Sequence, residues 1–89
     1  MKKFTCIAEY RGGTYISQYL AEDVFEAERI WANNLHPRYF KPREKKKIIE
    51  QINEGEFKPL PLEDAESVWC DTFVILDRFL LLNIVETVM

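Results

Sequence analysis

Residues 67–88 read SVWCDTFVILDRFLLLNIVETV and consist mainly of β-branched, aromatic and other apolar side chains. Such runs favour β-strands. The pair Asp77-Arg78 is the one break that is wide enough for a two-residue turn. We therefore predict strands over residues 67–76 and 79–88 that pair as a hairpin.

Both faces of this predicted hairpin are largely apolar. With Asp77-Arg78 as the turn, one face holds Trp69, Phe73, Ile75, Leu80, Leu82 and Ile84, and the other holds Val68, Cys70, Val74, Leu76, Phe79, Leu81 and Val85. Strands that are apolar on both faces are usually covered on both faces. We therefore expect each face of the hairpin to pack against another part of the protein or against a partner.

Asp71 interrupts the apolar pattern in mid-strand, between Trp69 and Phe73. A carboxylate in this position either faces solvent at a sheet edge or is desolvated, with a raised pKa. We expect the first arrangement.

A second hairpin is predicted over residues 3–21, because uncharged and polar positions alternate on both sides of Gly12-Gly13. Two glycines suit the positive φ angles of a type I′ turn. This turn would place Tyr10 opposite Tyr15 and Cys6 opposite Tyr19. The uncharged side chains assigned to the core are Phe4, Cys6, Ala8, Tyr10, Tyr15 and Tyr19.

Two helices are predicted between the hairpins. Asp23 is a suitable N-cap for a helix over residues 24–35, with Glu26 three residues later. Pro42 suits the first position of a helix that runs to about Asn53, and Gly55 suits its end. Loops are expected over residues 36–42 and 56–66, the second because prolines disfavour helices and central strands.

The predicted order is ββααββ, which indicates a single α+β domain over residues 1–89. We expect an antiparallel four-stranded sheet with two helices packed on one face. In shape, the first 35 residues, with the helical run EAERIWA, resemble the ββα half of HicB-type antitoxins. The second helix and the C-terminal hairpin depart from that pattern, so the expectations below rest on the residues alone.

Two short helices cover one face of such a sheet and leave the other without a partner. The unpartnered side chains are Val68, Val74, Phe79, Leu81 and Val85. A second copy of the chain is the simplest covering, because most soluble oligomers are symmetric homodimers. The alternatives are another protein or the loop over residues 56–66, with Phe57, Leu60 and Leu62, folded over this face.

Half of the basic residues lie in one short stretch. The chain carries 12 basic and 15 acidic residues and a net charge of −3. Residues 36–47, HPRYFKPREKKK, contribute +5, which leaves −8 for the rest. We call this stretch the basic segment. The simplest interpretation of this stretch is a solvated helix start, in which Lys46 can pair with Glu50 one turn along. The alternatives are contact with a protein partner or with single-stranded nucleic acid, for which the candidate residues are Arg38, Tyr39, Phe40, Lys41, Arg43, Lys45, Lys46 and Lys47.

No assembled catalytic or metal motif is present in the sequence. His36 is the only histidine, and Cys6 and Cys70 form no C-x-x-C pair. We expect both cysteines to be reduced, buried apolar side chains. Gly12-Gly13 lacks the spacing of a phosphate-binding loop. We therefore expect no metal, no cofactor and no catalytic residue, although converging carboxylates would allow a small enzyme.

No apolar run follows Met1-Lys2-Lys3, and no stretch of about 20 apolar residues occurs, so we expect neither a signal peptide nor a membrane span. These features predict a cytoplasmic protein without a membrane partner. We expect it to work by binding, as a homodimer that pairs through the C-terminal hairpin. Nucleic-acid binding by the basic segment is the second hypothesis.

Overall fold

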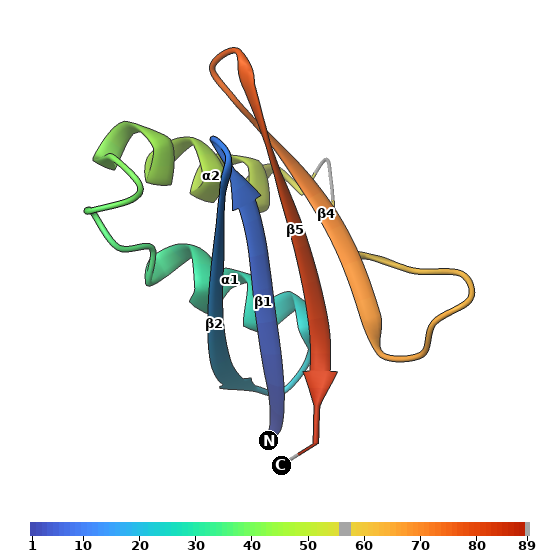
Figure 1. Ribbon diagram of the computed structural model, residues 1–89. Helices are drawn as coiled ribbons and strands as arrows, with labels where there is room; N and C mark the ends of the chain where they lie inside the picture. The colour runs from blue at the N-terminus through green and yellow to red at the C-terminus, as the bar shows by residue number, and fades with distance from the viewer. Residues whose placement is uncertain (56–57, 89) are drawn as a thin grey trace.

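The computed structural model describes residues 1–55 and 58–88 and has an α+β fold. The strands are β1 (Lys2–Tyr10), β2 (Gly13–Ala21), β3 (Leu60–Pro61), β4 (Val68–Ile75) and β5 (Arg78–Thr87), and the helices are α1 (Val24–Asn33) and α2 (Pro42–Glu54). The strands form one antiparallel sheet in the order β2-β1-β5-β4-β3. Both helices lie against the same face of this sheet, and the two chain ends lie close together (Figure 1).

The sheet has five strands, so the prediction of four was wrong by one short strand. β3 pairs with Trp69 and Cys70 of β4 and lies at the edge. Proline lacks a backbone N–H and is tolerated in edge strands, which explains why Pro61 did not prevent pairing. The prolines did exclude a central strand, as expected.

Both hairpin turns begin one residue earlier than predicted. In the first, Arg11 and Gly12 have φ angles of 53° and 78°, so Tyr10 pairs with Gly13 and Ala8 with Tyr15. In the second, Leu76 has a φ of 58° and Ile75 pairs with Arg78. Each change shifts the register by two residues, so every side chain stays on its predicted face.

Gly13, the first residue of β2, has no room for a side chain. A Cβ atom on this residue would lie 2.6 Å from the hydroxyl oxygen of Tyr15, two positions along the same strand. The Tyr15 ring therefore folds back over Gly13. This leaves Gly12 as the glycine that supplies the positive φ of the turn.

The core lies between the helices and one face of the sheet, as the alternation of the strands predicted. Its sheet side is formed mainly by Phe4, Cys6, Ala8, Tyr10, Phe73, Ile75, Leu80, Leu82 and Ile84. Val24, Ala27 and Trp31 from α1 and Ile48 from α2 complete it. Tyr15 and Tyr19 pack against this cluster while remaining half-exposed.

The opposite sheet face has no covering among the described residues. Residues 58–66 lie beside the edge of the sheet, and Leu60 and Leu62 are exposed (Figure 1). The predicted role of Phe57 in covering this face lies outside the described residues. We call this side of the sheet the uncovered face.

The helix ends follow the predicted capping residues. The Asp23 carboxylate accepts a hydrogen bond of 2.8 Å from the Glu26 amide, and the Glu26 side chain accepts one from the Glu22 amide. α1 ends at Asn33, two residues early, where the Asn34 side chain bonds to the Ile30 carbonyl. α2 ends one residue late at Glu54, and Gly55 adopts the left-handed conformation with φ 69°.

Glu44 connects the start of α2 to the first hairpin. Its carboxylate accepts hydrogen bonds from the Lys41 amide, at 2.8 Å, and from the Tyr10 hydroxyl, and Arg11 Nη1 lies 3.6 Å away. Burial acts to raise the pKa of Glu44, but these donors and charges outweigh it and hold the pKa below its usual value. A single buried carboxylate thereby fixes the basic segment against the sheet.

Replacing Glu44 should destabilise the fold. In Glu44→Ala the buried Tyr10 hydroxyl and the first turn of α2 lose their acceptor, so we expect a loss of about 2 kcal/mol in the free energy of unfolding. Urea denaturation followed by circular dichroism measures this loss. Glu50→Ala is the matched control, because Glu50 pairs only with Lys47 on the surface and should cost no more than about 0.5 kcal/mol. Equal losses in the two variants would contradict this role.

Candidate functional site

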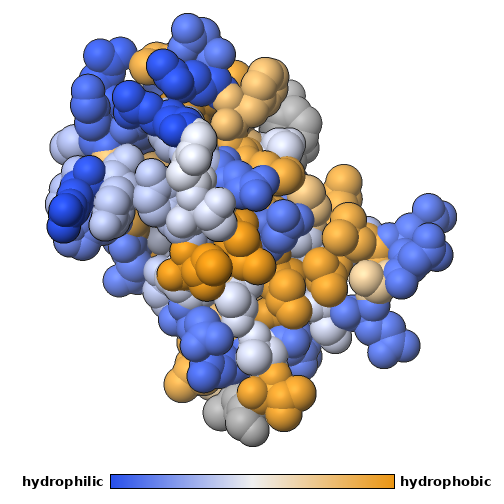
Figure 2. Space-filling view, in the orientation of Figure 1, coloured by the Kyte–Doolittle hydropathy of each residue, from blue (hydrophilic) through white to orange (hydrophobic). Residues whose placement is uncertain are grey.

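The uncovered face carries exposed apolar side chains among polar ones. Figure 2 shows apolar side chains across the middle of the sheet, with hydrophilic side chains around them. The apolar residues that point outward here include Ile7, Ile16, Leu20, Val74, Phe79, Leu81 and Val85. Polar side chains lie between them, among them Thr5, Gln18, Thr72 and Asn83. Ile16 and Phe79 are 67% and 72% exposed. Large exposed apolar patches mark interaction surfaces in monomeric proteins.

The structure places all five residues predicted for this surface, Val68, Val74, Phe79, Leu81 and Val85, on the uncovered face. The sequence analysis did not assign the N-terminal hairpin to it, although Ile7, Ile16 and Leu20 extend the same surface over β1 and β2. Their alternation with the core residues was the available signal, since it places these three apolar side chains on the face opposite the core.

Two opposite charges lie on the same face of β1. Lys3 and Glu9 alternate with Phe4, Cys6 and Ala8, which are buried, so both point toward the uncovered face near opposite ends of the strand. No ion pair links either residue to another group within the described part of the chain. The surface therefore has a positive end and a negative end.

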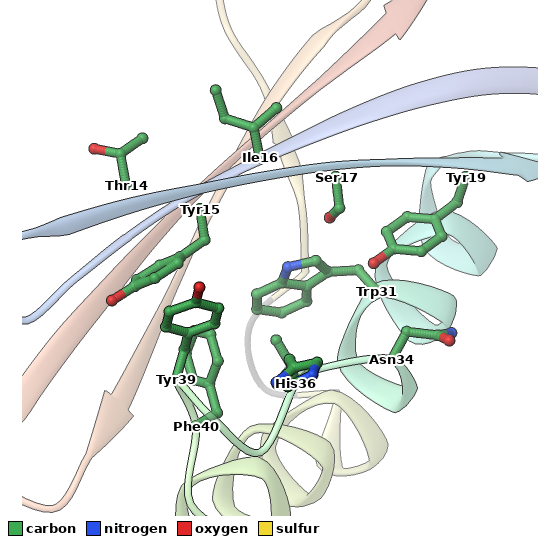
Figure 3. Close-up of a pocket in the computed structure, with 11 residues that line it drawn as sticks. Thr14, Tyr15, Ile16, Ser17, Tyr19, Trp31, Asn34, His36, Tyr39 and Phe40 are labelled. Atoms are coloured by element: carbon green, nitrogen blue, oxygen red, sulfur yellow. The ribbon is translucent and has the colours of Figure 1, made fainter.

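A second candidate site is an aromatic pocket between β2, the end of α1 and the loop that follows it (Figure 3). The cavity has a volume of about 390 Å³. Its side chains include Tyr15, Tyr19, Trp31, His36, Tyr39 and Phe40. In Figure 3 the tyrosine, tryptophan and histidine rings surround the cavity, while Thr14 and Ile16 point to the other side of β2.

Ring stacking holds this pocket together. The Tyr15 ring centroid lies 5.0 Å from that of Tyr39 and 5.4 Å from that of Phe40, and Phe40 stacks on Tyr10 at 5.6 Å. The Arg38 guanidinium carbon lies 5.7 Å from the centre of the Tyr39 ring. Such contacts give the loop a fixed conformation, so the pocket is preformed.

The basic segment is divided between the core and the surface. Phe40 is only 3% exposed, whereas Tyr39 is 47% exposed and lines the pocket. Lys45 donates to the Asn33 carbonyl, at 2.9 Å, at the end of α1, and Lys47 pairs with Glu50. Four other cations of the basic segment are exposed, and their side chains form no hydrogen bond or ion pair within the described residues. They are Arg38, Lys41, Arg43 and Lys46.

Asp71 is buried, so the expectation that it faces solvent was wrong. β4 has β5 on one side and β3 on the other, and Asp71 shares the covered face with Trp69 and Phe73. Its carboxyl group meets that of Glu28, from the buried side of α1; the two side chains are 5% and 3% exposed. Glu28 Oε2 and Asp71 Oδ2 are inaccessible and have no hydrogen-bond donor among the described residues.

The carboxyl group of Glu28 has a strongly raised pKa. Burial, assisted by the adjacent Asp71 carboxyl, raises the pKa of Glu28 from 4.5 to about 9. Arg29 opposes this shift. The same burial acts on the neighbouring Cys6, whose pKa rises to about 12. Both groups are therefore neutral at pH 7, which suits a buried position.

Glu28 should make the protein less stable as pH rises. The folded state keeps a proton that the unfolded chain releases above pH 4.5, so the contribution of Glu28 to stability is full below pH 4.5 and is lost as the pH rises to about 9. Glu28→Gln should flatten this dependence and stabilise the fold on the alkaline side. Urea denaturation at several pH values measures both effects.

Glu54→Gln, at an exposed position of α2, is the control and should leave the pH profile unchanged. A Glu28→Gln profile as steep as that of the original chain would contradict a protonated Glu28.

The cysteine expectation was correct for Cys6, which is fully buried, and incorrect for Cys70, which is half-buried on the uncovered face. Within residues 1–55 and 58–88 there is no cluster of three metal-ligating side chains. No described helix is long and apolar enough to cross a membrane.

No family model matches the chain, and no curated protein or solved structure is significantly similar to it.

Proposed function

We propose that the protein works by binding and that its basic unit is a homodimer joined through the uncovered face. The apolar surface over β1, β2, β4 and β5 carries this proposal. The buried carboxyl pair offers little support for catalysis, because a general acid or base must reach its substrate and oxygen atoms of both groups are inaccessible.

The size of the face is sufficient for a dimer. With about 4.8 Å between strands and about 3.4 Å per residue, the four long strands present a flat area of roughly 600 Å². Two such faces would bury roughly 1,200 Å² in total, the lower end of the range for specific interfaces. Packing of two sheets face to face is a common way to cover such surfaces.

The charges on β1 favour a particular arrangement. If the two-fold axis lies in the interface and is perpendicular to β1, the strand packs over its own copy in the opposite direction. Lys3 of one protomer then lies over Glu9 of its partner, and the pair occurs twice. An axis parallel to the strand would instead bring like charges together, so the first arrangement is self-complementary.

A charge exchange tests this arrangement. Lys3→Glu or Glu9→Lys alone should weaken the dimer about tenfold, because each creates two pairs of like charges. The double variant should restore the affinity, as measured by sedimentation equilibrium. Lys2→Glu is the matched control, because Lys2 points to the other face and pairs with Glu86. Additive weakening in the double variant would contradict the proposed axis.

An apolar substitution tests the surface itself. Leu81 points outward from the central strand β5, so Leu81→Lys should yield a folded monomer with an unchanged circular dichroism spectrum. The dimer proposal fails if the original chain sediments as a monomer at micromolar concentration, or if Leu81→Lys stays dimeric.

Nucleic-acid binding is a second candidate. The exposed ring of Tyr39, with Arg38 beside it, favours a stacked base and an adjacent phosphate. The burial of Phe40 and the pairing of Lys47 with Glu50 reduce the surface available for this role. It therefore ranks below protein binding.

A further inference from the structure

The two edges of the sheet differ in how they are protected. At the β4 edge, β3 pairs with Trp69 and Cys70. Further along, the Gln51 side chain donates to the Val74 carbonyl, at 2.7 Å, and accepts from the Val74 amide, at 2.9 Å. A short proline-containing strand and a side-chain amide thus occupy the backbone groups that another strand would need.

The β2 edge has no comparable protection. Its nine residues, Gly13–Ala21, include no charged residue and no proline, and its pairing with β1 contains no bulge. In residues 1–55 and 58–88, no group outside β1 forms a backbone hydrogen bond with it. Natural edge strands normally carry charges, prolines or bulges that prevent further pairing, so this edge is open to another strand.

The hairpin turn determines which backbone groups are free. Tyr10 and Gly13 flank the two-residue turn and exchange hydrogen bonds, so alternate residues from Gly13 onward face β1. The intervening residues present their N–H and C=O groups to solvent. These are Thr14, Ile16, Gln18 and Leu20.

The aromatic pocket lies directly beside this edge. Thr14, Ile16 and Ser17 contribute to its margin, and the rings of Tyr15, Tyr39 and Trp31 surround it on the helix side of the sheet (Figure 3). A strand added to β2 would direct every second side chain to that side. A cavity of about 390 Å³ accepts one aromatic or bulky aliphatic side chain.

The charges around the pocket indicate the rest of the ligand. Arg38, Lys41 and Arg43 follow the pocket residue His36 and are exposed. No acidic residue lines the pocket within the described chain. A ligand with carboxylates beside its apolar side chain would therefore be electrostatically complementary.

A second copy of β2 fits this site poorly. Its inward-facing Tyr15 and Tyr19 already pack against the core of their own protomer, so they could not enter the pocket of another. We propose that the β2 edge and the aromatic pocket together bind an extended, acidic peptide segment of a partner protein by strand addition, with one aromatic or bulky aliphatic side chain in the pocket. This site adjoins the uncovered face at Ile16, but its pocket lies on the helix side of the sheet and its hydrogen-bonding edge lies in the plane of the sheet, so both remain open in the homodimer.

The probes are short synthetic peptides that alternate glutamate and valine, with Phe, Tyr, Trp or Leu at the central position. Nuclear magnetic resonance should show new hydrogen-exchange protection at the amides of Thr14, Ile16, Gln18 and Leu20. The amides of Tyr15 and Ser17, which already face β1, should change little. In a Trp69→Phe background, Trp31 fluorescence reports occupation of the pocket by the peptides that lack tryptophan.

Matched peptides and variants test each part of the proposal. N-methylation of the peptide on its pairing side should weaken binding at least about tenfold, and N-methylation on the other side should not. Tyr39→Ala should remove the preference for a bulky central residue, and Arg38→Glu should weaken binding of the acidic peptides. Arg29→Glu, exposed on α1 and away from this pocket, is the charge control.

Four outcomes would overturn the proposal, and the first three concern the peptides and the chain alone. These are binding by none of the peptides, binding that is indifferent to the side of N-methylation, and protection of the same four amides by self-association alone. Competition by oligothymidylate in preference to every peptide would instead assign the pocket to nucleic acid and would also overturn it. The monomeric Leu81→Lys variant should still bind the peptides, so the peptide site can be tested independently of the homodimer.

Discussion

The organisation of this protein depends on one constraint: its two helices can cover only one face of a sheet that has large apolar side chains on both. α1 and α2 contain 10 and 13 residues, which corresponds to lengths of about 15 Å and 20 Å. Both pack on the same side, where the core residues of all four long strands are buried. The other side retains Ile16, Val74 and Phe79 as exposed apolar residues. The proposed dimer follows directly from this imbalance.

Much of the fold could be predicted from local patterns. The strand alternation identified the covered face correctly, and Asp23, Pro42 and Gly55 marked helix ends to within two residues. The first turn was misplaced because two glycines are interchangeable in a sequence, whereas in space the Tyr15 ring fills the volume above Gly13. β3 was missed because a two-residue edge strand has no detectable periodicity of its own.

The candidate sites were less predictable, since they are built from distant segments. The aromatic pocket combines β2, the end of α1 and residues 36–40, and no local spacing links Tyr15 to Tyr39. The carboxyl pair could have been anticipated in part. Asp71 and Phe73 are two residues apart in a strand and therefore point to the same face. Glu28 lies on the same face of its helix as the apolar residues Val24, Ala27 and Trp31. The charge of the basic segment did not show how much of it is free to bind a partner. Part of the segment is held in the fold by the buried carboxylate of Glu44.

The central claim is that a second copy covers the uncovered face. Isotope-filtered nuclear Overhauser measurements on a mixture of labelled and unlabelled chains test it most directly. The account predicts contacts between protomers at the methyl groups of Ile7, Leu81 and Val85, and none at those of the core residues Leu82 and Ile84. An absence of contacts between protomers, or contacts confined to the edge strand β2, would contradict it.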